Sequence, residues 1–381
     1  MNVTIIASVL GKENNGTTVA CMNLIRYLEK CGDNVKVVCC DKEKKGIDNY
    51  YIVPTLSLGK VLNKVIEKNG VEIAKTDNSI LKEAIKDADI IHVMVPFSLE
   101  RAAIKIAKEL KIPISAGFHC QAENLTCHLG LMNNRLINYL TYKNFYNHFY
   151  KYVDAIHYPT SFIKEVFERT IKHKTNSYVI SNGVSNTFKT RDVQKPEELN
   201  NKFVILFIGR FSKEKSHKVL LDAMKYSKHK DDIKLIFAGA GPRRCELINH
   251  AKKNKIDMPI MKFYSKEELC DVINYSDLYC HPSEVEIEGI ACLEALSAGL
   301  VPVISDSKRS ATKYLAIDDK NLFKCNDSVD LAKKIDYWFE HKEIKNLYKE
   351  AYINNTNVQK TDECMKKMRL MFKEVVDNYE R

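Results

Sequence analysis

The sequence predicts an α/β protein built from two doubly wound domains. Its 381 residues exceed the roughly 100–150 residues of a common single domain. Short runs of Val, Ile and Leu alternate with amphipathic helical stretches along almost the whole chain. These runs lack strict polar alternation, which is typical of parallel strands buried on both faces. A composition of 45% hydrophobic and 28% charged residues excludes a disordered or fibrous chain.

The expected strands form two series separated by helices. In the first half they cover residues 3–9, 35–40, 90–93, 112–117, 155–158 and 178–180. In the second half they cover residues 203–207, 234–237, 260–263, 278–280 and 301–304. The amphipathic segments include residues 18–30, 99–110, 217–227 and 292–298, and helices at 329–340 and 362–379 follow the last strand.

The domain boundary is expected in a polar stretch at 181–202, which has no buried-strand pattern and is rich in Asn and Lys. We expect a first domain over residues 1–186, a linker over 187–202 and a second domain over 203–361. A final helix at about 362–381 has no strand after it, so it is expected to pack back on the first domain.

The net charge indicates the kind of partner, and the cysteine pattern indicates the cellular compartment. The net charge of +10 favours an anionic partner, such as phosphate, nucleic acid or acidic lipid. No apolar run approaches the ~18 residues of a membrane-spanning helix. The twelve cysteines are scattered without a CxxC pair, which indicates a reduced, cytoplasmic chain. His119-Cys120 and Cys127-His128 are adjacent pairs whose members point to opposite faces, so no metal site is expected.

Two cations follow the strand expected at 203–207. Arg210 and Lys215 lie on a strand-to-helix turn, where backbone N–H groups already favour anions, and they are candidates for a diphosphate clamp. The alternative is a solvated basic turn. A second turn at 238–242, AGAGP, has glycines that would let backbone approach a ligand closely.

An acidic loop and helix follow the strand at 278–280, at the carboxyl end of the sheet where open sheets bind ligands. If the helix begins near Glu288, the N–H groups of residues 289–292 are free at this edge, and Glu294 lies about one and a half turns into the helix. Glu286 and Glu294 could then face one bound molecule from two sides. Acidic residues that complement the helix dipole explain Glu286 and Glu288 as well, but not Glu294, which stands among small and apolar residues.

Three ordered motifs in the second half resemble the donor-binding half of a family-4 retaining glycosyltransferase of the GT-B fold. They are GRFSKEK, GAGP and PSEVEIEGIACLEALSAGLVPV, and SNGVSNTF is similar to the turn that precedes the family's linker. The resemblance implies two Rossmann-like domains that face each other across a cleft. The first half matches only in outline, and in the family it selects the acceptor.

The resemblance also implies roles for individual residues. Arg210 and Lys215 match the pair that holds the donor diphosphate, and Glu294 matches the carboxylate that binds the nucleotide ribose. Glu286 matches the carboxylate that faces the transferred sugar, and His119, after the strand at 112–117, matches the histidine that reaches this sugar. The remaining matches are Glu288, Gly289 and Ile290, whose backbone touches the sugar, and Gly16 with Thr17, which correspond to an N-terminal glycine loop.

Three departures from the family pattern leave details open. The usual Glu-Gly-Phe-Gly reads Glu286-Ile287-Glu288-Gly289, which leaves the donor sugar undetermined. Ser216 stands where the family has a glycine after the lysine. The usual Gly-Gly doublet reads Asn15-Gly16, which weakens the role of that loop.

The expected activity is retaining, metal-independent and cofactor-free hexosyl transfer from a UDP-linked donor. The acceptor would be a hydroxyl of a lipid, a lipid-linked molecule or a glycan. The alternatives are a sugar-nucleotide epimerase of the same fold and a basic nucleic-acid-binding protein, although no nucleic-acid module is recognisable. A dinucleotide oxidoreductase would need G-x-G-x-x-G after the first strand, and the sequence has none there.

A basic stripe in the first half suggests a membrane partner. Lys60, Lys64 and Lys68 are four residues apart beside apolar neighbours, as in a helix that lies on an anionic membrane. A packed helix with one wet side is the alternative and the more common case. The aromatic stretch 139–152 is either core or an interface belt. With a lipid acceptor, the expected location is cytoplasmic and peripheral at the inner face of a membrane.

Overall fold

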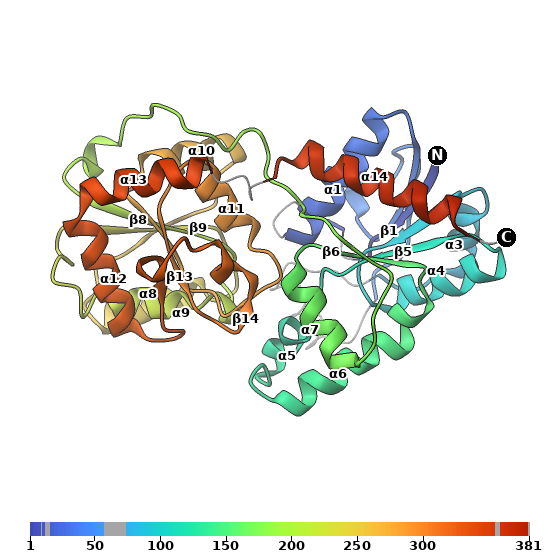
Figure 1. The fold of residues 1–381 in the computed structure, drawn as a ribbon, viewed down its shortest axis with the longest axis horizontal. Coiled ribbons are helices and arrows are strands. Elements are labelled where there is room, and N and C mark those ends of the chain that lie inside the picture. The colour runs from blue at the N-terminus through green and yellow to red at the C-terminus, as the bar shows by residue number, and fades with distance from the viewer. Residues whose placement is uncertain (9, 12–15, 57–73, 355–358, 380–381) are drawn as a thin grey trace. The chain divides into compact units, whose positions relative to one another are not determined.

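The computed structural model describes residues 1–8, 10–11, 16–56, 74–354 and 359–379, and the chain divides into two compact units (Figure 1). The first unit consists of Met1–Asn182 together with Thr361–Arg381, and the second consists of Gly183–Lys360. Each unit is a parallel sheet flanked by helices. The predicted fold class, two doubly wound α/β domains, is therefore confirmed.

The first unit is centred on a sheet of buried apolar strands. Among its described residues, seven strands follow the order β3-β2-β1-β4-β5-β6-β7, and neighbouring strands are parallel. The strand order reverses between β1 and β4, which makes the carboxyl ends of these strands a switch point of the kind that binds ligands. The strands are β1 (Asn2–Ile6), β2 (Asn34–Cys39), β3 (Tyr50–Ile52), β4 (Ile90–Val93), β5 (Ile114–Gly117), β6 (Ala155–Tyr158) and β7 (Ser177–Val179).

Helices connect and cover these strands. They are α1 (Gly16–Lys30), α3 (Asn78–Ile85), α4 (Ser98–Glu109), α5 (Ala122–Thr126), α6 (Arg135–His148) and α7 (Ser161–Ile171). The last helix, α14 (Thr361–Asp377), returns to the first unit and lies beside α1 (Figure 1). Its apolar face enters the core of that unit through buried Met365, Met368 and Phe372.

A buried carboxylate ties this returning helix to the start of the chain. Arg369 of α14 donates two hydrogen bonds to Asp33, at 2.6 and 2.9 Å, and the N-terminal ammonium lies 2.9 Å from the same carboxylate. Burial acts to raise the pKa of Asp33, but Arg369 and the N-terminal amine outweigh it and lower the pKa below its usual value. The ion cluster therefore fixes α14 beside the first strands.

The second unit repeats the same architecture. Its main sheet has the order β10-β9-β8-β11-β13-β15 in the part of the chain that the structure describes, and a short parallel pair joins β12 to β14. The strands are β8 (Phe203–Ile208), β9 (Ile233–Ala238), β10 (Ile260–Lys262), β11 (Leu278–His281), β12 (Val285–Glu286), β13 (Pro302–Ser305), β14 (Arg309–Ser310) and β15 (Leu322–Phe323). The helices are α8 (His217–Ala223), α9 (Arg244–Lys253), α10 (Lys266–Tyr275), α11 (Ile290–Ser297), α12 (Ser328–Glu340) and α13 (Lys342–Ile353).

The segment at 187–202 is attached along the second unit. Arg191 lies 2.7 Å from Glu267 and 3.3 Å from Asp271, both on α10. Lys195 is 2.7 Å from Asp277, which also accepts a hydrogen bond from the start of β8. These ion pairs fix the segment to the surface of the second unit.

Some element boundaries differ from those expected. The first strand ends at Ile6 because Ala7 and Leu10 form a turn, with the Leu10 N–H donating to the Ala7 carbonyl at 3.0 Å. Helix α8 ends at Ala223, and the chain turns to bring the Ser227 hydroxyl within 2.6 Å of Asp336 on α12. The expected segment 217–227 was therefore too long. Within the described ranges, no helix has the length and the hydropathy that crossing a membrane requires.

Candidate functional site

The two predicted cations stand on the loop that leaves β8. Arg210 is the second residue after the strand, and Lys215 ends a short 3-10 helix, Lys213–Lys215, just before α8. Both side chains are about one-quarter exposed, at 25% and 21%. They therefore stand at the surface of this edge of the sheet, where they remain accessible to an anion.

Each of these cations already has a carboxylate beside it. Arg210 lies 3.4 Å from Glu214, whose carboxylate also accepts a hydrogen bond from Ser212 at 2.5 Å. Lys215 forms an ion pair with Glu286 of β12. The structure thus brings Lys215 and Glu286 together, although they are separated by 71 positions in the chain.

Glu286 is the centre of a polar cluster. Burial acts to raise its pKa, but Lys215 and His281 outweigh burial and lower the pKa to about 2, so Glu286 is ionised at neutral pH. His281 Nε2 lies 3.2 Å from the Glu286 carboxylate, and His281 Nδ1 lies 3.0 Å from the Tyr279 hydroxyl. An ionised carboxylate in this position can stabilise positive charge on a ligand, but it cannot supply a proton.

A second ion pair supports the loop that carries Glu286. Arg309 of β14 lies 2.6 Å from Glu284, and the Ser307 hydroxyl donates to the Glu284 carbonyl at 2.6 Å. Strands β12 and β14 pair in parallel, with Glu286 opposite Ser310. The loop is therefore held on both sides before any ligand binds.

The turn at 288–290 starts α11 later than expected. The helix begins at Ile290 with Gly289 as its N-cap, and the Cys292 N–H donates to the Gly289 carbonyl at 2.8 Å, so the expectation of a free N–H at residue 292 is wrong. Gly289 is in the left-handed region at φ 83°, and a Cβ there would lie 2.1 Å from the Thr312 methyl group. Only glycine fits this position without rearrangement. Glu288 is buried beside it.

Glu294 lies on the second turn of α11 and has a very different environment. Its side chain is half-buried, and desolvation raises its pKa to about 8 despite the opposing charge of Lys266. No hydrogen bond or ion pair joins its carboxyl group to another residue that the structure describes. The group is therefore mostly protonated at neutral pH, and it can donate a hydrogen bond to a ligand or accept one from it.

The glycines of the turn at 238–242 have a packing role. A Cβ on Gly239 would lie 2.1 Å from the Gly209 carbonyl oxygen. Phe211 donates its N–H to Ala240 at 2.9 Å and accepts one from Arg243 at 3.1 Å. The close approach predicted for a ligand is thus made by the neighbouring loop that carries Arg210.

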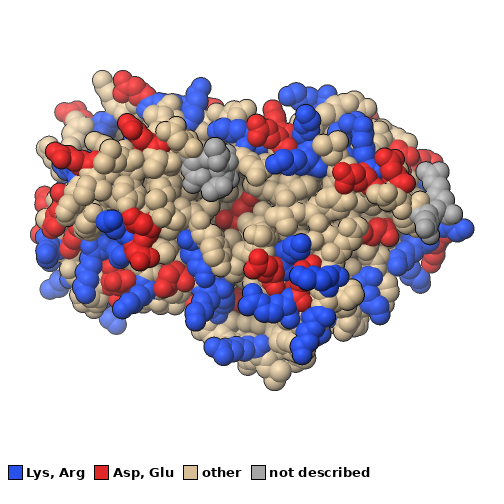
Figure 2. Space-filling model, viewed as in Figure 1, with Lys and Arg blue, Asp and Glu red and all other residues tan. Residues whose placement is uncertain are grey.

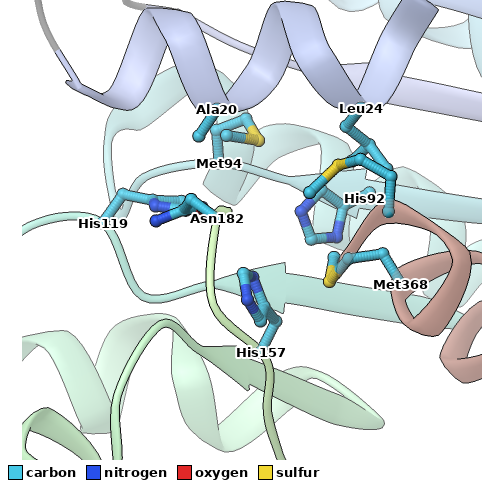
Figure 3. A pocket seen from close by; sticks show the side chains of 9 residues that line it. Ala20, Leu24, His92, Met94, His119, His157, Asn182 and Met368 are labelled. Carbon is cyan, nitrogen blue, oxygen red and sulfur yellow. The ribbon is translucent and has the colours of Figure 1, made fainter. Parts of the chain in front are cut away.

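In the first unit, His119 follows β5 and lines a cavity of about 210 Å³, including space open to solvent (Figure 3). Burial, with His157 and His92 nearby, holds the pKa of His119 well below its usual value. The rings of His119 and His157 lie edge to face, with centroids 5.6 Å apart. The cavity is lined by Ala20, Leu24, His92, Met94, His119, His157, Asn182, Met365 and Met368.

Two nitrogens in this cavity are acceptors without a partner among the described residues. Ser115 donates its hydroxyl to the Ile91 carbonyl, so His92 Nδ1, 3.0 Å away, donates to Ser115 and leaves Nε2 as an acceptor. His157 Nε2 donates to the Ile180 carbonyl at 2.6 Å and leaves Nδ1 as an acceptor. Burial lowers the pKa of His92 to about 3 and that of His157 to about 4, so both rings are neutral. The cavity therefore suits water or a hydroxyl group.

The other predicted residues of the first half give less information. Gly16 and Thr17 form the start of α1, where Gly16 is exposed and Thr17 is half-buried. Lys60, Lys64 and Lys68 lie outside the described residues. Among the residues that are described, no group of three or more His, Cys, Asp or Glu side chains could hold a metal ion.

Sequence reasoning missed several polar residues of this site. His281 ends β11 at the carboxyl edge of the sheet, and the rule that directed attention to this edge could have found it. Glu214 lies between the two predicted cations and could have been found as their partner. Arg309 and Glu284 come from separate loops, and no local pattern in the sequence marks them.

Two models of known protein families together match almost the whole chain. The family model "Glycosyltransferase Family 4" matches residues 14–188, and "Glycosyl transferases group 1" matches residues 188–356. The Anabaena protein Alr3699/HepE, solved in complex with UDP and glucose, is 14% identical and covers 98% of this chain and 100% of its own at a TM-score of 0.74. The fold is therefore the GT-B architecture of glycosyltransferases. The chain belongs to glycosyltransferase family 4.

Two relatives share a lipid-related name. The alpha-monoglucosyldiacylglycerol synthase of Streptococcus pneumoniae is 29% identical over 233 residues, which are 57% of this chain and 51% of that protein, so the match spans about half of the relative's length. The protein of the same name from Acholeplasma laidlawii is 22% identical over 346 residues, which are 87% of this chain and 86% of that protein.

Proposed function

We propose that this chain is a retaining glycosyltransferase that moves a hexosyl group from a UDP-linked donor to a lipid hydroxyl without a metal ion. The observation that carries the proposal is the cluster of Arg210, Lys215 and the ionised Glu286 at the carboxyl edge of the second sheet. A diphosphate leaving group gains negative charge while the anomeric carbon gains positive character. The cluster offers the matching charges for both.

The second unit is proposed to hold the donor. Arg210 and Lys215 would bind the diphosphate while they keep Glu214 and Glu286 as partners, and their positive charge would offset that of the leaving group without a metal ion. Glu294 would meet the ribose hydroxyls, and the backbone at Gly289 and Ile290 would touch the sugar. Glu286, ionised because its pKa is about 2, would face the sugar as a fixed negative charge.

The first unit is proposed to hold the acceptor. The neutral imidazole of His119 can donate or accept a hydrogen bond at the transferred sugar without adding a positive charge. The departing phosphate would take the proton from the attacking hydroxyl, on the same face of the sugar from which it leaves. Attack on that face retains the anomeric configuration. The domains proposed for these roles are 1–186, with the final helix, and 203–361, joined by 187–202.

The relatives support the choice of donor and acceptor. The name of both relatives describes an alpha-glucosyl product on diacylglycerol, and the Anabaena structure holds UDP and glucose. UDP-glucose is itself alpha-linked, so an alpha-linked product would mean retention. The site residues add the charge pattern that such a donor needs.

A transfer assay tests the proposal. The purified chain would be incubated with radiolabelled UDP-glucose and detergent-dispersed diacylglycerol, in excess chelator, and the lipid product would be examined by NMR. Label should move to the organic phase, and the anomeric proton should show the small coupling of an alpha-linkage. A donor converted to its epimer without acceptor would instead favour an epimerase, and transfer that requires added magnesium would contradict the metal-independent mechanism.

A further inference from the structure

An apolar surface lies on the first unit, away from the residues of the proposed donor site in the sequence. Leu129, Leu131, Leu136, Tyr139 and Leu140 are all exposed, and the fractions reach 73% for Leu129 and 66% for Leu136. Single exposed leucines are ordinary, but five large apolar side chains within one short segment are typical of an interaction surface. We name these five residues, with Arg135 and Lys143, the α6 patch.

Helix geometry puts the α6 patch on one side of its helix. Asn138, Tyr142 and Phe145 form the buried face of α6. Leu136 and Leu140 are four positions apart, and Tyr139 lies between them at three from Leu136, so these three share the outward face. The outward face of α6 is therefore largely apolar, although it is exposed.

The preceding turn is fixed against this helix. The Thr126 hydroxyl donates to Asn138 at 2.7 Å, and the Asn138 amide donates to the Met132 carbonyl at 2.8 Å. Asn134 caps the helix by accepting from the Ile137 N–H. These bonds hold the turn that carries Leu129 and Leu131 beside the start of α6. The residues of the patch therefore have fixed positions relative to one another.

The charged side chains of the segment that carries the patch are all basic. Residues 124–153 contain no Asp or Glu, while Arg135, Lys143 and Lys151 are basic. Lys143 donates to the Ile171 carbonyl at 2.9 Å and lies 5.8 Å from the centre of the Tyr139 ring. In Figure 2 the tip formed by α5 and α6 in Figure 1 carries uncharged and basic surface.

Helix α4 extends this basic border. Arg101 of α4 donates to Asn144 of α6 at 3.2 Å, and Lys108 lies 5.0 Å from the centre of the Tyr152 ring. Lys105, on the same face of α4, is exposed. Glu109, at the end of α4, is the acidic residue of this face.

We propose that the α6 patch docks this chain on an anionic lipid bilayer. Leucines and a tyrosine bordered mainly by Arg and Lys match the interface of a membrane whose headgroups are negative. The leucines would enter the boundary between headgroups and acyl chains, and the basic side chains would contact the headgroups. This surface deepens the proposed function, and rests on it for the lipid acceptor, which such docking would bring within reach. The α6 patch does not include Lys60, Lys64 or Lys68.

Vesicle flotation tests the docking surface without using transfer. The full chain would be mixed with vesicles of phosphatidylcholine alone or with phosphatidylglycerol added, at low and high salt. We expect binding to the anionic vesicles that falls as salt rises. Leu136→Ser with Leu140→Ser should weaken this binding by at least about tenfold, since two exposed leucines lose their burial in lipid. Arg135→Glu should weaken it by about fivefold or more.

Matched controls are available in the second unit. Leu347→Ser removes a leucine that is 68% exposed on α13, and Lys252→Glu reverses an exposed charge on α9, and both should bind vesicles like the parent chain. Thermal unfolding would confirm that all variants are folded. Unchanged vesicle binding by both α6 variants would overturn the proposal. A shift in oligomeric state on ultracentrifugation, with vesicle binding unchanged, would assign the patch to a protein partner and also overturn it.

The two proposals can fail separately. Vesicle binding that depends on the α6 patch, in a chain that transfers no sugar, would leave the docking surface intact and contradict the proposed function. If the chain transfers sugar to detergent-dispersed diacylglycerol but does not bind anionic vesicles, the proposed function would stand and the docking surface would be contradicted.

Discussion

The two units place different kinds of groups at the carboxyl edges of similar sheets. In the second unit the edge carries ionised side chains in pairs, Arg210 with Glu214 and Lys215 with Glu286. In the first unit it carries neutral imidazoles, and the pKa of His119 lies well below its usual value. The same fold can therefore supply fixed charge in one unit and uncharged hydrogen-bonding groups in the other.

This difference follows from burial and from neighbours. The histidines of the first unit lie among methionine and leucine side chains, and desolvation removes their charge. Glu286 is desolvated too, but Lys215 and His281 beside it keep it ionised. We infer that charge stabilisation belongs to the second unit and hydrogen bonding at the sugar and acceptor to the first.

The largest expected effect comes from removing one cation of the second unit. Arg210→Ala and Lys215→Ala should each slow hexosyl transfer by about 10²–10³-fold, because the charge developing on the diphosphate loses a fixed partner. Initial rates with UDP-glucose in excess chelator would measure this. Lys213→Ala is the matched control, since Lys213 is exposed on the same short helix. Loss of activity in that variant as well would contradict a specific role for the other two residues.

Replacing glycine by alanine should cost more stability at the tightly packed turn of the second unit than at an open turn of the first. Gly289→Ala should destabilise the second unit by about 2–4 kcal/mol, because the left-handed conformation and the contact with Thr312 both oppose a side chain. Gly46 also has a positive φ, 86°, but nothing lies within 4 Å of its added Cβ, so Gly46→Ala should cost about 1–2 kcal/mol. Denaturant unfolding would show the two values, and equal losses would contradict the tight packing at residue 289.

Acid should destabilise the first unit through its neutral histidines. An unfolded histidine binds a proton near pH 6.5, whereas folded His157 and His92 bind one only near pH 4 and pH 3. Below pH 6.5 the unfolded chain therefore binds more protons, and stability falls as pH decreases, by up to about 1.4 kcal/mol per pH unit for each ring.

Unfolding midpoints between pH 7 and pH 4 would measure this slope. His157→Gln should make the slope shallower by close to one proton, whereas His148→Gln, at an exposed position of α6, should leave it unchanged. An identical slope in the His157 variant and the parent chain would show that this ring is protonated in the folded state.

The smallest predicted effect concerns Glu294. Its pKa of about 8 means that the free chain holds a proton there at pH 7, whereas ribose hydroxyls that donate to the carboxylate would favour its ionised form. Binding of UDP-glucose should therefore release up to about one proton, and affinity should rise as pH increases from 7 to 8. Calorimetry in buffers of different ionisation enthalpy would detect the proton. Glu294→Gln should abolish the release, and proton uptake by the parent chain would contradict the ribose contact.

The fold was largely predictable because its central strands are continuous apolar runs. Strand β8 is buried at all six positions, and such a run has few alternatives. Strand β3 was missed because its three residues are only half-buried and form the edge of the sheet. Helix α13 was also missed, since Tyr352 is its only buried residue within the described chain.

The candidate site was predictable only where it depends on local position. Arg210 and Lys215 follow a strand end, and this rule identifies them without a structure. The pairing of Arg309 with Glu284 and the meeting of His92, His119 and His157 depend on the spatial order of strands. That order comes from tertiary packing, so the neutral cavity of the first unit had no signal in the sequence.

The division of roles between the two units can be tested most directly by calorimetric titration with UDP-glucose. Parent chain, Arg210→Ala, Lys215→Ala and His119→Ala would be compared at pH 7.5, each after a check of folding by thermal unfolding. The two variants of the second unit should bind UDP-glucose at least about tenfold more weakly, because each loses one charge-assisted contact to the diphosphate. His119→Ala should bind it within a few-fold of the parent and still lose transfer. Full affinity in the Arg210 and Lys215 variants, with binding lost in the His119 variant, would contradict the account.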